Sequence, residues 1–145
     1  MVSEGAGESL KLGHALAAEV EAHAREALPR ECCGLVGGRW PEAETVYRLR
    51  NVARDPLVAY EADPQELFAA QRRMRARGES LVAVYHSHPR ARDPVPSPTD
   101  VKLAFYPAAV YLIIGFGEDG GAVVRAFRIY EREGRWERAG LAPAD

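Results

Sequence analysis

The segment at residues 80–88, SLVAVYHSH, constrains the possible folds of the chain more than any other stretch. A short and almost unbroken apolar run of this length is typical of a strand at the centre of a sheet. Four other segments have the length and composition of strands, and the EDGG sequence between the last two predicts a hairpin turn. These four segments are residues 32–38, 45–53, 108–116 and 122–131. A β-sheet is therefore the expected framework.

Two longer segments predict helices. Residues 14–28 place apolar side chains at helical spacing, and Pro29 ends that pattern. Residues 64–77 begin with a proline in the first turn, and Asp63 before it is a suitable N-cap. Shorter strands are expected near residues 10–12 and 135–140. The predicted fold class is α/β in the α+β sense, a mixed β-sheet flanked by at least two helices.

Size and charge exclude several classes of protein. The 145 residues predict one domain, residues 1–145, whose first eight residues are expected to be flexible. A formal net charge of -2 offers no basic field for nucleic acid or for an anionic membrane surface. No apolar run is long enough to span a membrane and no leader pattern opens the chain, so the sequence predicts a cytoplasmic protein. The adjacent Cys32 and Cys33 are predicted to be small apolar fillers, because a disulfide between neighbours is strained.

The predicted central strand ends in two histidines that are one residue apart. Along a strand, alternate residues point to the same face, so His86 and His88 project together and Ser87 points away. Two neutral imidazoles side by side can hold a divalent transition metal. Pro89 then prevents the strand from continuing as a fully paired central one.

The segment SPTD follows after a loop rich in proline. Ser97 as N-cap, Pro98 in the first turn and Asp100 three residues after the cap predict the start of a short helix, residues 97–105, without any metal. The same Asp100 could also reach a metal held by His86 and His88. Catalytic zinc sites have three protein ligands and an open fourth position, whereas structural zinc sites are closed by four protein ligands. Both interpretations are compatible.

These residues resemble a known family. His-Ser-His-Pro, seven residues and then Ser-Pro-Thr-Asp is similar to the HxHP-x7-SxxD signature of the JAMM (JAB/MPN+) metalloproteases, which also place a glutamate upstream, here Glu31. The resemblance implies an MPN/JAB-like fold with a cytidine-deaminase-like, three-layer architecture. It implies one Zn²⁺ per chain, bound by His86, His88 and Asp100. It also implies that Glu31 is the general base for a zinc-activated water and that Ser97 donates to the oxyanion.

The resemblance is to the stand-alone prokaryotic members of the family. It implies a zinc metallopeptidase that hydrolyses the amide or isopeptide bond after the C-terminal glycine of a ubiquitin-like sulfur-carrier protein. The leaving group stays open between cysteine, a lysine side chain and a peptide. The alternatives are a RadC-like protein and a catalytically silent MPN scaffold or binding module. The zinc deaminase and HExxH signatures are absent from the sequence, and a cysteine nucleophile in so apolar a segment is disfavoured.

Overall fold

The computed structural model describes residues 7–144, so the expectation of a flexible start falls mostly outside the described residues. In chain order the elements are β1 (Leu10–Lys11), α1 (His14–Ala27), β2 (Cys33–Arg39), β3 (Glu42–Leu49), α2 (Pro64–Ala76), β4 (Ser80–Ser87), α3 (Pro98–Lys102), β5 (Val110–Phe116), β6 (Ala122–Tyr130), the short 3-10 helix η1 (Glu131–Glu133), β7 (Arg135–Arg138) and β8 (Leu141–Ala142).

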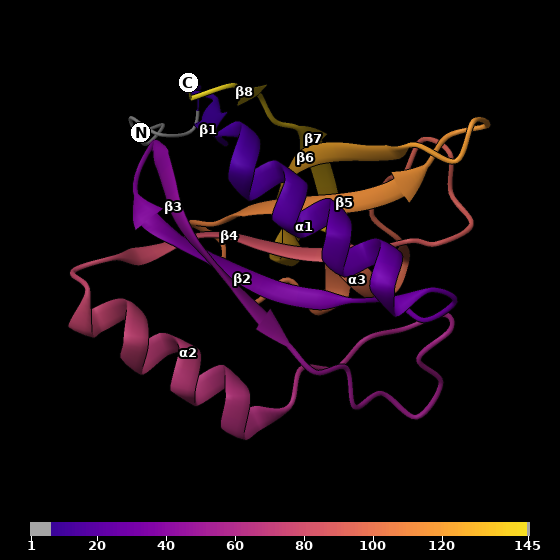
Figure 1. Cartoon of the computed structure of the whole chain (residues 1–145), viewed down its shortest axis with the longest axis horizontal. Coiled ribbons are helices and arrows are strands. Elements are labelled where there is room, and N and C mark those ends of the chain that lie inside the picture. The colour runs from indigo at the N-terminus through magenta and orange to yellow at the C-terminus, as the bar shows by residue number, and fades with distance from the viewer. Residues whose placement is uncertain (1–6, 145) are drawn as a thin grey trace.

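All the strands named above belong to one mixed sheet with the order β7-β6-β5-β4-β2-β3-β1-β8. Strand β2 pairs antiparallel with β3 and β4, whereas β4 and β5 run parallel. The short β8 pairs with β1, so elements from the two ends of the chain lie side by side (Figure 1). A mixed sheet with few helices confirms the predicted α+β class.

Helices cover both faces of this sheet and create two separate cores. One core lies under α1, which contributes the buried Val20 and Ala24. The other lies under α2, which contributes Ala70 and Met74. In Figure 1, α1 crosses in front of the strands and α2 lies on the other side of β2 and β3. The central strands must therefore be apolar on both faces, which is why residues 80–88 lack the alternation of a half-exposed strand.

The adjacent cysteines show this two-faced burial. Cys32 belongs to the core under α1 and Cys33 to the core under α2. Burial raises the pKa of the Cys32 thiol to about 11 and that of Cys33 to about 12, so both are neutral at physiological pH. Both side chains fill apolar cores, as predicted.

The ends of β3 differ from the prediction, which placed this strand at residues 45–53. The strand begins earlier because Glu42 pairs directly with Arg39 across the turn of the β2–β3 hairpin. It ends at Leu49 because the N–H of Arg50 donates to a carboxylate oxygen of Glu66 in α2, at 2.6 Å, instead of to a neighbouring strand. The period-2 pattern identified the strand, but contacts from α2 decided where it stops.

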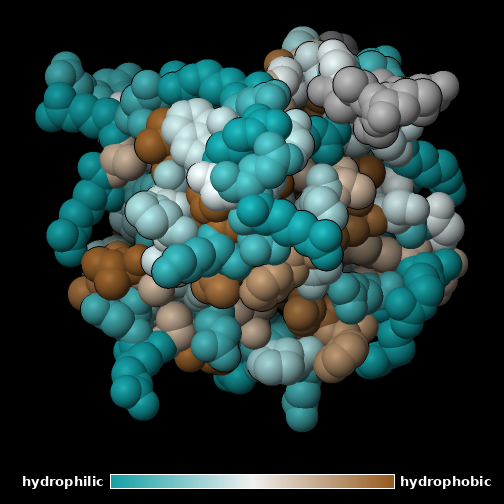
Figure 2. All heavy atoms as spheres, turned by 180° about the vertical axis from the view of Figure 1, so that it is seen from behind, coloured by the Kyte–Doolittle hydropathy of each residue, from teal (hydrophilic) through white to brown (hydrophobic). Residues whose placement is uncertain are grey.

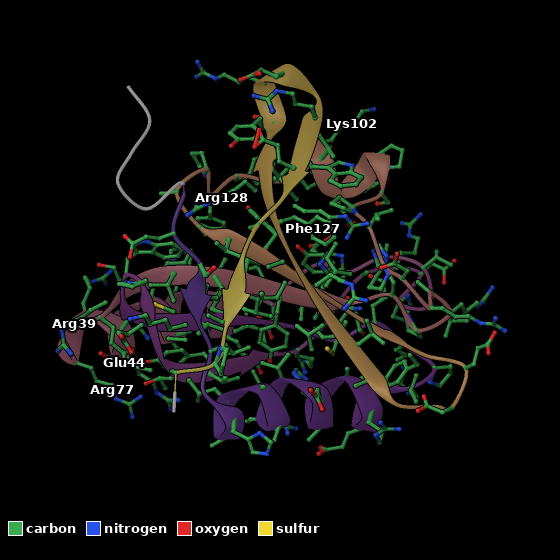
Figure 3. All side chains as sticks on the ribbon, turned by 90° about the horizontal axis from the view of Figure 1, so that it is seen from above. Arg39, Glu44, Arg77, Lys102, Phe127 and Arg128 are labelled. Atoms are coloured by element: carbon green, nitrogen blue, oxygen red, sulfur yellow. The ribbon has the colours of Figure 1, made fainter. Side chains whose placement is uncertain are left out.

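The two ends of β4 have different surroundings. Near its start, Arg39 Nη1 donates to Glu44 at 3.0 Å and Arg39 Nη2 donates to the carbonyl oxygen of Arg77 at 3.3 Å (Figure 3). Lys102, well apart from this charged group in the same view, belongs to α3, which follows the other end of β4. His86 and His88 therefore lie at the opposite end of β4 from the contacts of Arg39 with Glu44 and Arg77.

The surface mixes polar and apolar side chains. On the face turned away from the viewer of Figure 1, hydrophobic patches lie between charged residues (Figure 2). The large apolar residues that the surface exposes include Leu57, Val58, Leu103 and Phe105. None of the helices within residues 7–144 has both the length and the hydropathy that crossing a membrane requires.

Candidate metal centre and cleft

The candidate site lies at the C-terminal end of β4. His86 is the penultimate residue of this strand and is fully buried, and His88 follows immediately after its end. The N–H of His88 donates to the carbonyl oxygen of Ile114 in β5 at 2.8 Å, which holds the backbone beside the sheet. The chain then leaves through α3 before it returns as β5, parallel to β4. Crevices outside the carboxyl ends of parallel strands are favoured positions for ligand sites.

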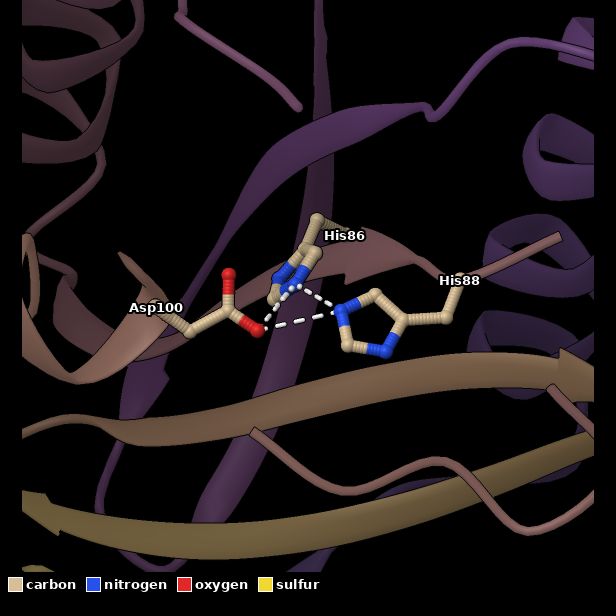
Figure 4. Close-up of side chains that lie close together, drawn as sticks. All are labelled: His86, His88 and Asp100. Carbon is tan, nitrogen blue, oxygen red and sulfur yellow. Dashed lines mark hydrogen bonds and ion pairs between the residues drawn. The ribbon is translucent and has the colours of Figure 1, made fainter. Parts of the chain in front are cut away.

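Three potential ligand atoms converge at this point. The Nε2 atoms of His86 and His88 are 3.1 Å apart. Asp100 Oδ2 is 3.2 Å from Nε2 of His86 and 3.0 Å from Nε2 of His88 (Figure 4). Two residues from a strand end and one from the first turn of α3 therefore form a nearly equilateral triangle of nitrogen and oxygen atoms.

This triangle fits a zinc ion. Tetrahedral zinc with bonds of about 2.0–2.1 Å to nitrogen and oxygen holds its ligand atoms about 3.3 Å apart. The separations here, 3.0 to 3.2 Å, lie close to that value. Two imidazoles and one carboxylate also match the donor set of zinc sites that keep one position open. His86, His88 and Asp100 are thus able to hold a metal ion together.

The ionisation states of His86 and Asp100 favour metal binding. Burial lowers the pKa of His86, so its imidazole is neutral and offers a lone pair. Burial opposes ionisation of Asp100, but hydrogen bonds from His86 and His88 outweigh it and hold the pKa of the carboxyl well below its usual range. Burial also acts against a proton on His88, but the hydrogen bond and charge of Asp100 raise the pKa of this histidine. The carboxylate is therefore the one fixed negative charge of the triangle.

Ser97 and Asp100 form a complete capping box at the start of α3. The Asp100 N–H donates to Ser97 Oγ at 3.0 Å, and the Ser97 N–H donates to Asp100 Oδ2 at 2.9 Å. The helix is shorter than the predicted residues 97–105, because it ends at Lys102. The same Oδ2 faces both histidines, so one carboxylate oxygen belongs to the helix cap and is also the candidate ligand atom. The two interpretations of SPTD describe the same geometry.

The strand register brings Glu31 to this site. Cys33 pairs with His86 in the antiparallel β2–β4 ladder, so continuing the register places Glu31 opposite His88. The Glu31 side chain is only 6% exposed, and burial raises the pKa of its carboxyl to about 7. A carboxylate with a pKa near neutrality is suited to exchange protons at physiological pH.

A cleft of about 470 Å³ joins these groups. Its walls include Glu31, His88, Asp100 and Ser97, together with residues of the loop that precedes α2. Four of the five residues that the sequence singled out therefore line one opening, and the fifth, His86, lies buried behind it.

The family can now be stated. The family model described as prokaryotic homologs of the JAB domain matches residues 14–130, most of the chain. The chain belongs to the prokaryotic JAB family. This membership confirms the resemblance to JAMM proteins that the histidine and serine–aspartate motifs indicated.

Several curated relatives of this JAB protein have assigned names. A desampylase of Haloferax volcanii is 44% identical over 98 residues, which cover 63% of this chain and 69% of that protein. A probable TtuB-protein conjugate cleaving protease of Thermus thermophilus is 42% identical over 125 residues, 86% of this chain and 79% of that protein. A CysO-cysteine peptidase of Mycobacterium tuberculosis is 36% identical over 114 residues, 76% of this chain and 75% of that protein.

Solved structures share the JAB fold. A solution structure of a Desulfitobacterium hafniense protein superposes with a TM-score of 0.80 at 34% identity, covering 93% of this chain and 92% of that one. A structure described as JAMM, a metalloprotease-like zinc site in the proteasome and signalosome, gives a TM-score of 0.57 at 16% identity, covering 95% of this chain and 100% of that one. At that identity the second likeness shows the fold alone.

Tyr60 is one part of the candidate site that sequence reasoning missed. Its ring stacks on the imidazole of His86, with the ring centroids 4.5 Å apart and the planes 27° from parallel. The buried Nδ1 of His86 has no hydrogen-bond partner within residues 7–144. Packing against Tyr60, rather than the hydrogen bond that usually orients a metal-binding histidine, therefore holds this ring. No spacing pattern in the sequence links the two residues.

Asn51 is a second such residue. Its Nδ2 donates to the carbonyl oxygens of Glu31 and Ala59, each at 3.0 Å. Its Oδ1 accepts from the N–H groups of Ala53 and Glu61, at 2.9 and 3.0 Å. One amide side chain thus ties the loop that lines the cleft to the backbone of Glu31. A lone asparagine after a predicted strand gives too little local signal to predict this role.

Proposed function

We propose that this protein is a zinc-dependent metallopeptidase that hydrolyses the amide or isopeptide bond after the C-terminal glycine of a ubiquitin-like protein. The observation that carries the proposal is the convergence of His86, His88 and Asp100 beside a cleft that Glu31 and Ser97 also line. The named activities of the relatives, directed at TtuB conjugates and at CysO-cysteine, support the same reaction class.

In this proposal each residue has one chemical task. His86, His88 and Asp100 would hold the zinc ion. When bound, zinc lowers the pKa of a coordinated water and polarises the scissile carbonyl. Glu31 takes up the proton of the attacking water and then delivers it to the leaving amine. The pKa of about 7 that burial gives Glu31 allows it to act in both directions near neutral pH.

Ser97 can assist without giving up its structural contact. Its oxygen uses one lone pair to accept the Asp100 N–H in the helix cap. The hydroxyl proton remains available to donate, because a serine hydroxyl is one donor and two acceptor sites. We propose that this proton points to the carbonyl oxygen of the substrate and stabilises the negative charge that develops there.

The rim of the cleft supports a protein substrate with an extended tail. Leu57, Val58 and Leu103 line the opening and are exposed, Val58 at 62%. Apolar side chains around a polar centre are suited to contact a folded carrier, while its tail enters the cleft. Glycine at the end of that tail passes closest to the metal without steric conflict.

Fusions of TtuB and of CysO to a short peptide test the proposed function. The zinc-loaded protein is incubated with fusions that carry Gly-Gly or Ala-Ala before the junction, and with the free tail peptide, and cleavage is followed by mass spectrometry. We expect cleavage of the Gly-Gly fusions and poor cleavage of the other two substrates. Equal cleavage of all three would indicate a general peptidase. No cleavage of any substrate would contradict the proposal and favour a binding module.

A further inference from the structure

One cation in the wall of the cleft has no task in the reaction described so far. Arg90 is the one arginine or lysine among the described residues that line this cleft. The other charged residues there, apart from His88, are the carboxylates of Glu31 and Asp100, which the proposed chemistry already uses.

Among residues 7–144 Arg90 has no partner, although its neighbours in the same loop do. Arg92 donates to Glu118 at 2.6 Å, and Asp93 accepts from Arg125 at 3.2 Å. Over residues 7–144 the guanidinium of Arg90 has neither a hydrogen bond nor an ion pair. The charged residues of the loop that do not line the cleft, Arg92 and Asp93, are thus paired, whereas Arg90 in the cleft wall is not paired within residues 7–144.

The backbone that carries Arg90 is held firmly. The N–H of Ala91 donates to the carbonyl oxygen of His88 at 3.0 Å, which closes a turn with Arg90 inside it. The carbonyl oxygen of Ala91 accepts from Phe116 in β5 at 2.8 Å. Gly115 lies under this turn, where any Cβ would collide with the Ala91 carbonyl oxygen and Pro94. The backbone of Arg90 is thus held beside the turn that leads from His88.

The position of Arg90 limits which group it can bind. It is two residues from His88, so their Cα atoms are at most about 7.6 Å apart, because consecutive Cα atoms are about 3.8 Å apart. A free amino acid joined to the carrier through its α-amine carries its carboxylate two bonds from the scissile nitrogen. Such a carboxylate lies within reach of a guanidinium on this turn, and arginine binds carboxylates in bidentate geometry.

We propose that Arg90 is a specificity-determining residue that binds the α-carboxylate of a single amino acid leaving group. This inference rests on the proposed function and narrows its substrate to carrier–amino acid conjugates. In the reaction the bond between the carbonyl carbon of the last glycine and the nitrogen of the amino acid breaks. The hydroxyl of water adds to that carbonyl carbon, and the remaining proton of the water goes to the nitrogen of the amino acid. The amino acid leaves with its carboxylate still intact.

Other leaving groups lack the group that Arg90 would bind. In a peptide, a neutral amide replaces the carboxylate at this distance from the scissile nitrogen. In a lysine conjugate, four methylene groups separate the scissile nitrogen from the backbone of the acceptor. Both would leave Arg90 without its anionic partner, so both should be poorer substrates.

Three TtuB conjugates test the inference: TtuB–alanine, TtuB–alaninamide, and TtuB linked to the side chain of Nα-acetyl-lysine amide. We expect wild-type kcat/KM for TtuB–alanine to exceed that for the alaninamide by about tenfold or more, mainly through KM, as for a charge-assisted hydrogen bond. Arg90→Gln should abolish this preference and Arg90→Lys should retain part of it. Arg92→Gln, a matched change in the same loop, should leave the preference unchanged. Salt should weaken the preference, because the ion pair is exposed.

The outcomes separate this inference from the proposed function. Equal cleavage of the acid and the amide by the wild type would overturn the role of Arg90 and leave the peptidase proposal standing. A wild-type preference that survives Arg90→Gln would assign the carboxylate to another residue and also overturn the inference. Failure of the zinc-loaded protein to cleave any TtuB conjugate or any CysO fusion would instead contradict the proposed function.

Discussion

Ser97 has two roles in the proposed site, and a set of three substitutions separates them. As the N-cap of α3, its oxygen accepts the Asp100 N–H at 3.0 Å. As an oxyanion donor, it would use the hydroxyl proton. Ser97→Ala removes both functions, whereas Ser97→Gly removes the hydroxyl but leaves a residue that is tolerated at N-caps. Ser97→Thr retains the acceptor and the donor.

The expected magnitudes differ for stability, metal content and turnover. Loss of the cap in Ser97→Ala should cost about 1 kcal/mol, and Ser97→Gly only a few tenths. For a domain of this size, 1 kcal/mol lowers Tm by about 3 °C. Zinc content should not change, because the N–H of residue 97, which donates to Asp100 Oδ2 at 2.9 Å, belongs to the backbone and is retained in every variant. Both Ala and Gly should lower kcat by about 10² to 10³, the usual cost of one lost oxyanion donor.

The assay combines three measurements on the same preparations: thermal unfolding, zinc content by mass spectrometry, and the rate of cleavage of a TtuB fusion. The decisive variant is Ser97→Gly, which should be nearly as stable as the wild type but much slower. Wild-type turnover in Ser97→Gly would reduce Ser97 to a helix cap and refute the oxyanion role. Loss of zinc from the same variant would show that the backbone contact is not what orients Asp100.

Three further predictions concern the ligands, the proton shuttle and the pH dependence of stability. The His86→Ala/His88→Ala variant should lose its zinc while its circular dichroism stays close to wild type, and stoichiometric zinc in it would contradict the ligand assignment. Glu31→Gln should keep its zinc and lower kcat by about 10² to 10⁴, whereas loss of the metal would make Glu31 a ligand. Burial and the nearby Arg48 lower the pKa of His23 from 6.5 to about 4, so the unfolded chain binds more protons between these values. Glu31, whose pKa burial raises to about 7, contributes a dependence of opposite sign over much of this range. The free energy of unfolding of the wild type relative to that of His23→Gln, measured with urea, should therefore fall as pH drops from 6.5 towards 4. A difference between the two proteins that does not change with pH would refute the assignment.

Local sequence patterns were sufficient for most elements of the fold. The helix predicted at residues 64–77 is found at Pro64–Ala76, because its start is encoded by Asp63, which accepts the Gln65 N–H at 3.0 Å. The strand predicted at residues 80–88 is found at Ser80–Ser87. Caps and periodicity act over a few residues, so such features can be predicted without knowledge of the rest of the chain.

Pairings between distant segments could not be predicted in this way. The parallel neighbours β4 and β5, and the closure of the sheet by β8 against β1, depend on how the two cores pack. Nothing in the two residues of β8 distinguishes them from a loop. Their strand character comes from backbone hydrogen bonds to residues more than one hundred positions away.

The residues of the candidate site also differ in whether the sequence or only the tertiary structure identifies them. The spacing of His86, His88 and Asp100 allowed a three-ligand site, and the family resemblance implied it, because a strand end and a capped helix place these side chains with little help from other segments. At the level of the sequence, Glu31 was assigned to the site by the family resemblance alone. It lies 57 residues before His88, and only the β2–β4 register places the two residues opposite each other. The tertiary structure decided the stacking of Tyr60 on His86 and the position of Arg90 in the cleft wall, where it has no partner within the described residues. Both features depend on which residues surround a side chain in the folded protein, and only the packing of distant segments determines those neighbours.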